Sequence, residues 1–173
     1  TGERVHTLES LKLLNALLVS LHAGFGIITP TIVLSRFSAS TRASIAKNIV
    51  AGFTGSGHAH VGACKAAMSL FKKLKLVNDN SAENKVRDIF CNIKPIPGFG
   101  HPILNLDPRN EMLSSLIHSS GEEFEYFALY QQVVSVVLQD YQLHPNVDLI
   151  AAAVMLDLGL DPSYKDIMYD LTR

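Results

Sequence analysis

Apolar side chains recur at helical spacing along most of the chain. Leucines occur every three or four positions from Leu8 to Leu21, and Thr7, just before them, suits a helix N-cap. Segments of the same kind, separated by breaks rich in Gly, Pro or Asn, predict further helices over residues 30–50, 59–74, 81–93, 107–119, 122–143, 147–158 and 163–173. No stretch alternates between apolar and polar residues with a period of two. The pattern therefore predicts an all-α fold.

The helix predicted over residues 30–50 combines large and small side chains. Pro30 suits its first turn. The middle, residues 38–44, consists mostly of serine, alanine and threonine, whose small side chains would let another helix approach closely. Six large apolar residues are expected to face a core: Ile32, Val33, Phe37, Ile45, Ile49 and Val50.

Composition narrows the class of protein. The chain has 173 residues, of which 47% are apolar and 18% charged, which is enough for one buried core and too apolar for a disordered chain. A net charge of -1 gives no electrostatic reason to expect a nucleic acid or an anionic membrane as partner. No apolar run reaches the roughly 18 residues that span a bilayer. Cys64 and Cys91 do not make a disulfide framework, and we expect buried or half-buried thiols in a reducing, cytoplasmic compartment.

The stretch from Pro95 to Arg109 carries the first candidate chemistry. Two prolines and two glycines within residues 95–100 prevent a helix from continuing, so the backbone must turn there. His101 follows this turn, and Arg109 opens the next predicted helix. One loop thus carries a side chain that can transfer protons and a planar, permanently charged guanidinium. Chemistry on a carboxylate substrate needs that combination.

Asp148 is a carboxylate at the start of an otherwise apolar segment. One interpretation is a residue at a helix start, where the helix dipole and the free backbone N–H groups favour a negative charge. The other is a carboxylate removed from water and kept as a general base. The sequence alone leaves both open.

His58 and His60 lie beside two glycines at the opening of a predicted helix. They can be partly exposed loop histidines, or two ligands of a metal site for which no third ligand stands at a suitable spacing. The third interpretation is a neutral imidazole whose N–H donates to a developing oxyanion, a form that a helix N-terminus favours. His22 and Arg173 lie at the ends of predicted helices, where each can be simply a favourable C-terminal group.

Several motifs occur in a fixed order on this chain. They are His60-Val61-Gly62-Ala63 with Ala66-Ala67-Met68, then Gly98-Phe99-Gly100-His101, Asp107-Pro108-Arg109 and Pro145-Asn146-Val147-Asp148. Their combination resembles the citrate synthase family. The resemblance extends from about residue 17 to residue 173 and corresponds to the later half of a family member.

The resemblance implies a citrate synthase-like multi-helical fold with a small domain and part of a large domain. Residues 1–57 would supply large-domain helices, residues 58–145 the small domain and active-site loops, and residues 146–173 a return to the large domain. It also implies a homodimer, with which the small-residue faces at residues 38–44 and 151–153 agree.

By resemblance, three residues would carry the chemistry. Asp148 is similar to the base that removes a proton from the α-carbon of acetyl-CoA. His60 is similar to the donor that stabilises the resulting thioester enol. His101 is similar to the histidine that hydrogen-bonds the keto oxygen of oxaloacetate and protonates it as the new C–C bond forms. Such a reaction needs a base within hydrogen-bond reach and a donor at the oxygen where charge develops.

The resemblance also implies substrate-binding groups. Arg109 and Arg173 look like clamps for substrate carboxylates, and His22 matches the first histidine of a family His-x-x-His segment. The expected ligands are a coenzyme A thioester as substrate and a 2-oxo acid or dicarboxylate, with no metal. The loop that resembles backbone near the coenzyme A adenine consists of Pro97, Gly98, Phe99 and Gly100.

The implied function is Claisen-type condensation of acetyl-CoA, or another acyl-CoA, with oxaloacetate or a related 2-oxo acid. The interval from His101 to Arg109 is one residue shorter than in typical synthases and is closer to the citryl-CoA lyase branch, so cleavage is the alternative direction. A third interpretation is a structural or regulatory member without activity. Three departures from the family pattern motivate it, namely Phe25, Val61 and Cys64, and Lys65 is a fourth departure.

Overall fold

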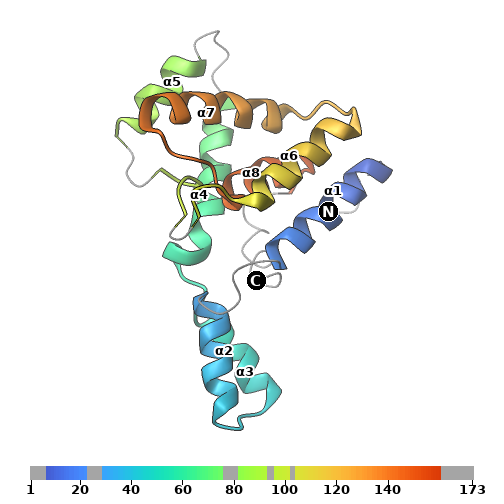
Figure 1. Cartoon of the computed structure of the whole chain (residues 1–173), viewed down its shortest axis with the longest axis vertical. Helices are drawn as coiled ribbons and strands as arrows, with labels where there is room; N and C mark the ends of the chain where they lie inside the picture. The colour runs from blue at the N-terminus through green and yellow to red at the C-terminus, as the bar shows by residue number, and fades with distance from the viewer. Residues whose placement is uncertain (1–6, 23–28, 76–81, 93–95, 102–103, 161–173) are drawn as a thin grey trace.

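The computed structural model describes residues 7–22, 29–75, 82–92, 96–101 and 104–160, apart from the side chains of residues 22, 58–61 and 82. These residues form no strand (Figure 1). Their helices are α1 (Leu8–His22), α2 (Pro30–Ser40), α3 (Ile45–Phe53), α4 (His58–Lys75), α5 (Ala82–Phe90), α6 (Pro108–Ser120), α7 (Glu125–Tyr141) and α8 (Val147–Asp157). The prediction of an all-α fold is confirmed. The helix predicted over residues 163–173 lies outside the described residues, and the division into domains stays a prediction.

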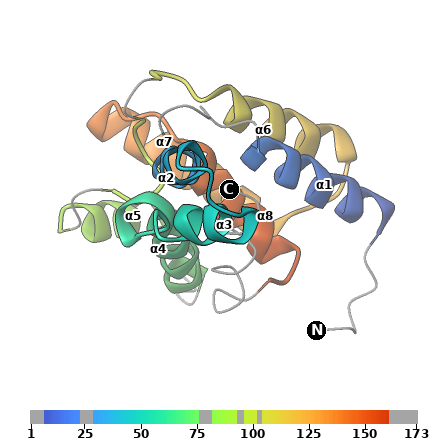
Figure 2. The same ribbon diagram turned by 90° about the horizontal axis from the view of Figure 1, so that it is seen from below.

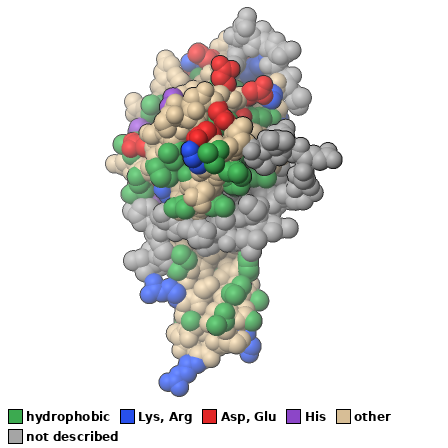
Figure 3. Space-filling model, turned by 90° about the vertical axis from the view of Figure 1, so that its right-hand side faces the viewer, with side chains coloured by type: hydrophobic (Ala, Val, Ile, Leu, Met, Phe, Trp, Pro, Cys, Tyr) green, Lys and Arg blue, Asp and Glu red, His purple; other side chains and the backbone are tan. Residues whose placement is uncertain are grey.

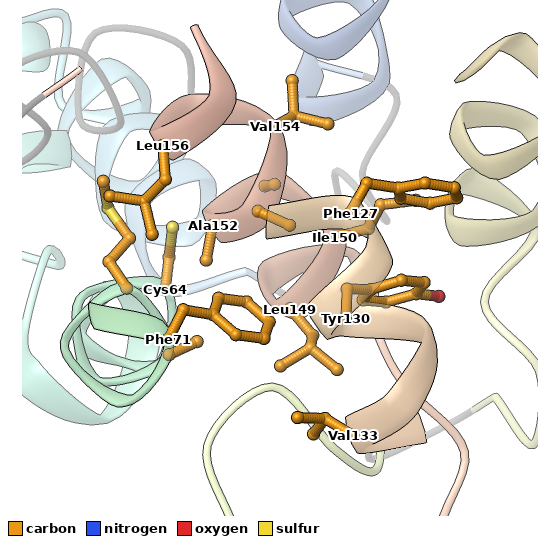
Figure 4. Packing of buried hydrophobic residues seen from close by; sticks show 14 of the residues in the cluster. Cys64, Phe71, Phe127, Tyr130, Val133, Leu149, Ile150, Ala152, Val154 and Leu156 are labelled. Atoms are coloured by element: carbon orange, nitrogen blue, oxygen red, sulfur yellow. The ribbon is translucent and has the colours of Figure 1, made fainter. Parts of the chain in front are cut away.

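Helix α8 is the centre of the core. Every residue from Val147 to Leu156 is buried, because a helix that is apolar on all sides can be stable only when other elements surround it. It packs against α4 and α7, and also against α1 and α6. Figure 4 shows Leu149 of α8 between Phe71 of α4 and the ring of Tyr130 on α7, with Ala152 of α8 nearer to Cys64 of α4. The predicted buried helix over residues 147–158 is therefore confirmed, one residue shorter at its end.

Helices α1 and α6 run side by side on one flank of α8 (Figures 1 and 2). Helix α8 also holds the start of α7, through hydrogen bonds that its last residue accepts. Phe124, at the N-cap of α7, has no side-chain atom that accepts a hydrogen bond. The carboxylate of Asp157 supplies the acceptor instead. Asp157 accepts the backbone N–H groups of Tyr126 and Phe127, both at 2.9 Å. The end of α8 thus caps the beginning of α7.

The prediction of one helix over residues 30–50 is wrong, because α2 and α3 form a hairpin. Helix α2 ends at Ser40 and α3 begins at Ile45. The hydroxyls of Ser40 and Thr41 each donate to the backbone carbonyl three residues earlier, at 2.7 Å. Arg42 then adopts a left-handed conformation, with φ of 58°. Hydroxyls bonded to nearby carbonyls compete with helix continuation, and a left-handed residue ends it.

The two helices of the hairpin approach each other closely. Ser35 Oγ donates to the backbone oxygen of Asn48 at 3.0 Å, and Ser38 Oγ donates to Asn48 Oδ1 at 2.8 Å. A Cβ atom at Gly52 would lie 2.3 Å from Ser35 Oγ. The expected small-residue helix face at residues 38–44 is confirmed only at Ser38, because residues 41–44 form the turn between the two helices.

The large apolar residues of the hairpin do not face the core. The hairpin extends from the helical body (Figure 1), and Phe37 and Ile45 are 73% and 79% exposed. Figure 3 shows hydrophobic side chains along the hairpin, with basic side chains at its edges. The prediction of a core-facing set is therefore wrong for five of the six residues, since exposed positions include Val33, Phe37, Ile45, Ile49 and Val50.

The two cysteines lie in different environments. Cys64 on α4 is fully buried, whereas Cys91 is exposed, and neither forms a disulfide. The prediction of free thiols is confirmed, and the expected burial is wrong for Cys91. Among the described helices, none is both long enough and apolar enough to cross a lipid bilayer.

Candidate active site

Two loops meet at the beginning of α8. The N–H of Gly100 donates to the carbonyl of His144 at 2.9 Å, and the N–H of Asn146 donates to the carbonyl of Gly98 at 2.9 Å. An isolated antiparallel bridge joins the residues between them. These backbone bonds hold the loop at residues 96–101 against residues 144–146.

The side chain of Asn146 completes this junction. Its Oδ1 accepts the backbone N–H of Asp148 at 2.9 Å, which caps α8. Its Nδ2 donates to the backbone oxygen of Gly100 at 2.8 Å, across 46 positions of the chain. One amide therefore joins the residue before His101 to the helix turn that carries Asp148.

Gly98 lets the loop lie directly on α8. Its φ of 78° is left-handed, a conformation that glycine adopts without a steric penalty. A Cβ atom here would lie 2.7 Å from Leu149 Cβ and 2.9 Å from Leu149 Cα. Gly98 is thus required both by its backbone angle and by its contact with the residue after Asp148.

His101 is half-buried, and its ring has a defined hydrogen-bond direction. The backbone N–H of Leu104 donates to Nδ1 at 3.0 Å. Because Nδ1 accepts this bond, the proton of the neutral ring is on Nε2. The neutral imidazole is therefore the Nε2–H tautomer, in which Nε2 is the donor.

Asp148 is buried, with 9% of its surface exposed, in the first turn of α8. The capping acceptor of this helix is Asn146, so the carboxylate of Asp148 is not the cap. The helix dipole favours a negative charge at this position. A carboxylate that is largely removed from water and not used as the cap is suited to act as a base.

Arg109 is buried and paired with Asp107. Its Nε donates to Asp107 Oδ1 and its Nη2 donates to Oδ2, both at 2.8 Å. Burial raises the pKa of Asp107, but the guanidinium and the backbone N–H groups of Val147 and Arg109 outweigh it and hold that pKa below its ordinary value. The pair is therefore ionic at neutral pH.

The remaining predicted site residues are located only in part. His60 belongs to the first turn of α4 and His22 is the last residue of α1, and neither side chain is described. Arg173 lies outside the described residues. Pro97, Gly98, Phe99 and Gly100 form the loop that rests on α8. The roles of all these residues stay predictions.

Two contributors to the site were not predicted from the sequence. Asp107 and Asn146 entered the sequence analysis only as members of motifs, with no role of their own. The position of each directly before a helix was the available signal, because Asp and Asn are preferred N-caps. Asp107 also bonds Val147, and Asn146 also bonds Gly100. These partners are distant in the sequence, so no local pattern predicts the contacts.

Within the described ranges, no group of three or more His, Cys, Asp and Glu side chains could hold a metal ion. The metal interpretation of His58 and His60 concerns side chains outside the description. A hollow between α1 and α6 is lined by residues such as Leu13 and Ile117 and contains none of the predicted site residues. The residues around the start of α8 include a carboxylate, an imidazole and a guanidinium, and such groups suit proton transfer on a substrate that bears carboxylates.

Comparisons with known proteins place this chain in a family. The family model described as citrate synthase, C-terminal domain, matches residues 2–173. Citrate synthase 2 of Bacillus subtilis is 28% identical over 149 residues, which cover 80% of this chain and 39% of that protein. The chain therefore spans less than half the length of that curated relative.

Solved structures show the same likeness. The citryl-CoA lyase from Hydrogenobacter thermophilus superposes with a TM-score of 0.86 at 26% identity, over 98% of this chain and 67% of that one. A citrate synthase from the archaeon Thermoplasma acidophilum, solved as a ternary complex with carboxymethyl coenzyme A and oxaloacetate, gives 0.78 at 21% identity. That match covers 98% of this chain and 47% of the other, and it shows the fold alone. Because the family model matches nearly every residue, this chain belongs to the citrate synthase family.

Proposed function

We propose that this protein is a citrate synthase-type enzyme that joins the acetyl group of acetyl-CoA, or another acyl group on coenzyme A, to oxaloacetate or a related 2-oxo acid. The observation that carries the proposal is the side chain of Asn146. It bonds both to the loop that ends in His101 and to the first turn of α8, which contains Asp148. Membership of the citrate synthase family supports the class of reaction.

In the proposed reaction, Asp148 takes a proton from the carbon next to the thioester carbonyl. His60 donates a hydrogen bond to the carbonyl oxygen on which negative charge develops. The enol carbon then attacks the keto carbon of the 2-oxo acid, and His101 passes its Nε2 proton to the keto oxygen. One C–C bond and one hydroxyl group form, and hydrolysis of the thioester releases coenzyme A.

The binding groups act before this chemistry. Arg109 and Arg173 hold substrate carboxylates through the paired N–H groups of a guanidinium, which a lysine cannot reproduce. His22 contributes to the same site. The loop at residues 97–100 lies close to the bound coenzyme A. Each correctly positioned acid or base contributes on the order of 10²–10⁴ to the rate, so the reaction needs all three catalytic residues.

Cleavage of citryl-CoA is the second candidate function. The likeness to a citryl-CoA lyase and the short interval between His101 and Arg109 favour it. It uses the same residues in reverse: a base takes the hydroxyl proton, the C–C bond breaks, and the enol of acetyl-CoA is protonated. A catalyst accelerates both directions, so the two candidates differ in their net substrates.

Turnover of the purified protein at its full natural length tests this proposal. Release of coenzyme A thiol is followed with acetyl-CoA and oxaloacetate, and release of oxaloacetate is followed with citryl-CoA. We expect turnover in at least one assay. No turnover in either, together with no binding of acetyl-CoA or oxaloacetate in isothermal titration, would favour an inactive structural or regulatory member.

We also propose a homodimer in which the α2–α3 hairpin is covered by the same hairpin of a second copy. The hairpin exposes large apolar side chains on both helices, for example Phe37 and Ile45. Two helices alone cannot enclose a core, whereas two such hairpins related by a two-fold axis make a four-helix bundle. Residues 29–57 contain three basic residues and no acidic one, and in Figure 3 basic side chains lie at the edges of the hairpin.

A further inference from the structure

Asp107 makes more contacts than a helix cap requires. Its side chain is buried, with 1% exposed. Oδ1 accepts the backbone N–H of Arg109 at 3.1 Å, which is the capping bond of α6. The same carboxylate accepts Nε and Nη2 of Arg109, and Oδ2 also accepts the backbone N–H of Val147 at 2.9 Å.

These contacts connect two parts of the candidate site. Val147 is the first residue of α8, directly before Asp148, and it is 40 positions away from Asp107 in the chain. Arg109 is the candidate carboxylate clamp. One rigid, buried carboxylate therefore fixes the guanidinium to the helix end that carries the candidate base.

The pairing leaves the guanidinium able to bind a substrate. A guanidinium has five N–H groups, of which Asp107 takes one from Nε and one from Nη2. Asp107 does not take the other three, which can donate to a ligand carboxylate. A bidentate partner also prevents the long side chain from sampling other rotamers, which lowers the entropy lost when a ligand binds.

We propose that Asp107 is a positioning residue, which orients Arg109 relative to Asp148 so that the carboxylate of a 2-oxo acid is held next to the base. This inference rests on the function proposed above. Asp107 itself acts through Arg109 and does not touch the substrate. Its loss should therefore weaken binding of the dicarboxylate selectively and leave binding of the coenzyme A thioester nearly unchanged.

Isothermal titration of the full-length protein with oxaloacetate and with acetyl-CoA tests the proposal. Asp107→Asn keeps the shape and one capping oxygen but removes the charge and the bidentate contact. Asp157→Asn is the matched control, because it makes the same change in a half-buried capping carboxylate at the other end of α8. All titrations are made at a temperature at which thermal unfolding shows every variant to be folded.

We expect Asp107→Asn to weaken oxaloacetate binding by about 10- to 100-fold, the effect of losing a charge-assisted hydrogen bond, and acetyl-CoA binding by less than about 3-fold. Asp157→Asn should change neither affinity. Unchanged oxaloacetate binding in Asp107→Asn overturns the proposal, and so does an equal loss for both ligands, which would indicate a merely structural role. Absence of oxaloacetate binding in the wild type also overturns it.

A second variant covers the case in which Asp107→Asn is too unstable to titrate. Asp107→Glu keeps the charge but displaces it by one methylene group, and it should also weaken oxaloacetate binding selectively. Unchanged affinity in Asp107→Glu would then contradict the proposal. If the Asp107 variants lose oxaloacetate binding selectively but the wild type turns over no substrate, this inference remains intact and the proposed enzymatic function is refuted.

Discussion

Two capping carboxylates show how the surroundings of a single residue set its charge. Asp107 and Asp157 each accept two backbone N–H bonds, and burial raises the pKa of both. The Arg109 guanidinium beside Asp107 reverses the effect and lowers its pKa. Burial prevails at Asp157, whose pKa is raised although the N–H groups of Tyr126 and Phe127 oppose the shift. The difference lies in the presence of a bidentate cation.

The opposite shifts predict opposite effects of pH on stability. Asp107 has a lowered folded pKa, so its contribution is present above its ordinary pKa of about 4 and is lost as the pH falls through the lowered value. Asp157 has a raised folded pKa, so its contribution is present below about pH 4 and is lost as the pH rises through the raised value.

Urea unfolding between about pH 3 and pH 7 measures both effects. Relative to the wild type, Asp107→Asn should show a smaller fall in the free energy of unfolding towards acid pH. Asp157→Asn should show a smaller fall as the pH rises above about 4. Identical pH profiles for the wild type and both variants would contradict the electrostatic assignment.

At the scale of helices, the sequence predicted those elements whose ends carry strong signals. The apolar run from Val147, preceded by Asn146, defined α8 to within one residue. The turn between α2 and α3 was missed because it contains no Gly or Pro. Serine and threonine hydroxyls form it, through hydrogen bonds that a helical periodicity does not reveal.

The candidate site could be predicted as a set of residue types but not as a geometry. Asp148, His101 and Arg109 were identified from motifs. Their connection through Asn146 and Asp107 depends on contacts between residues 40 or more positions apart, at 2.8 and 2.9 Å. Local sequence patterns carry no information about such distances.

The loop at residues 96–101 packs closely against α8 at Gly98. Two glycine-to-alanine variants, at Gly98 and at Gly100, test this contact. Gly98 and Gly100 both have left-handed φ values, of 78° and 76°. Only Gly98 faces another element, since a Cβ atom at Gly100 would meet nothing within 4 Å. Gly100→Ala should therefore cost about 1–2 kcal/mol from backbone strain.

Gly98→Ala should cost more, roughly 2–5 kcal/mol, because overpacking against the backbone of Leu149 adds to the same strain. The free energy of unfolding from urea denaturation measures both variants. Equal losses for Gly98→Ala and Gly100→Ala would show that the close contact between loop and helix is absent in solution.

At the scale of the whole molecule, the α2–α3 hairpin shows that an apolar helix face is not necessarily buried within the same chain. Periodicity shows which residues share a face, but it does not show what covers that face. In the described part of the chain, Phe37 and Ile45 of the hairpin remain exposed, whereas α8 is enclosed by four helices. The proposed second copy would give the hairpin the cover that other helices give α8.

Light scattering coupled to size-exclusion chromatography tests the proposed dimer. Phe37→Glu and Ile45→Glu each place a charge at a highly exposed hairpin position, so neither should unfold the single chain. We expect the wild type to have the mass of a dimer and both variants the mass of a monomer. Leu11→Glu on α1, at a position 50% exposed, is the control and should remain dimeric. A dimer that survives both hairpin changes would place the interface elsewhere.

The most direct measurement of the central claim is the turnover rate of Asp148→Asn beside that of Asp157→Asn. Both variants remove one carboxylate charge from α8, at its two ends. If Asp148 is the base, its variant should lose on the order of 10²–10⁴ in rate, while Asp157→Asn stays close to the wild type. Equal rates for Asp148→Asn and the wild type would contradict the account.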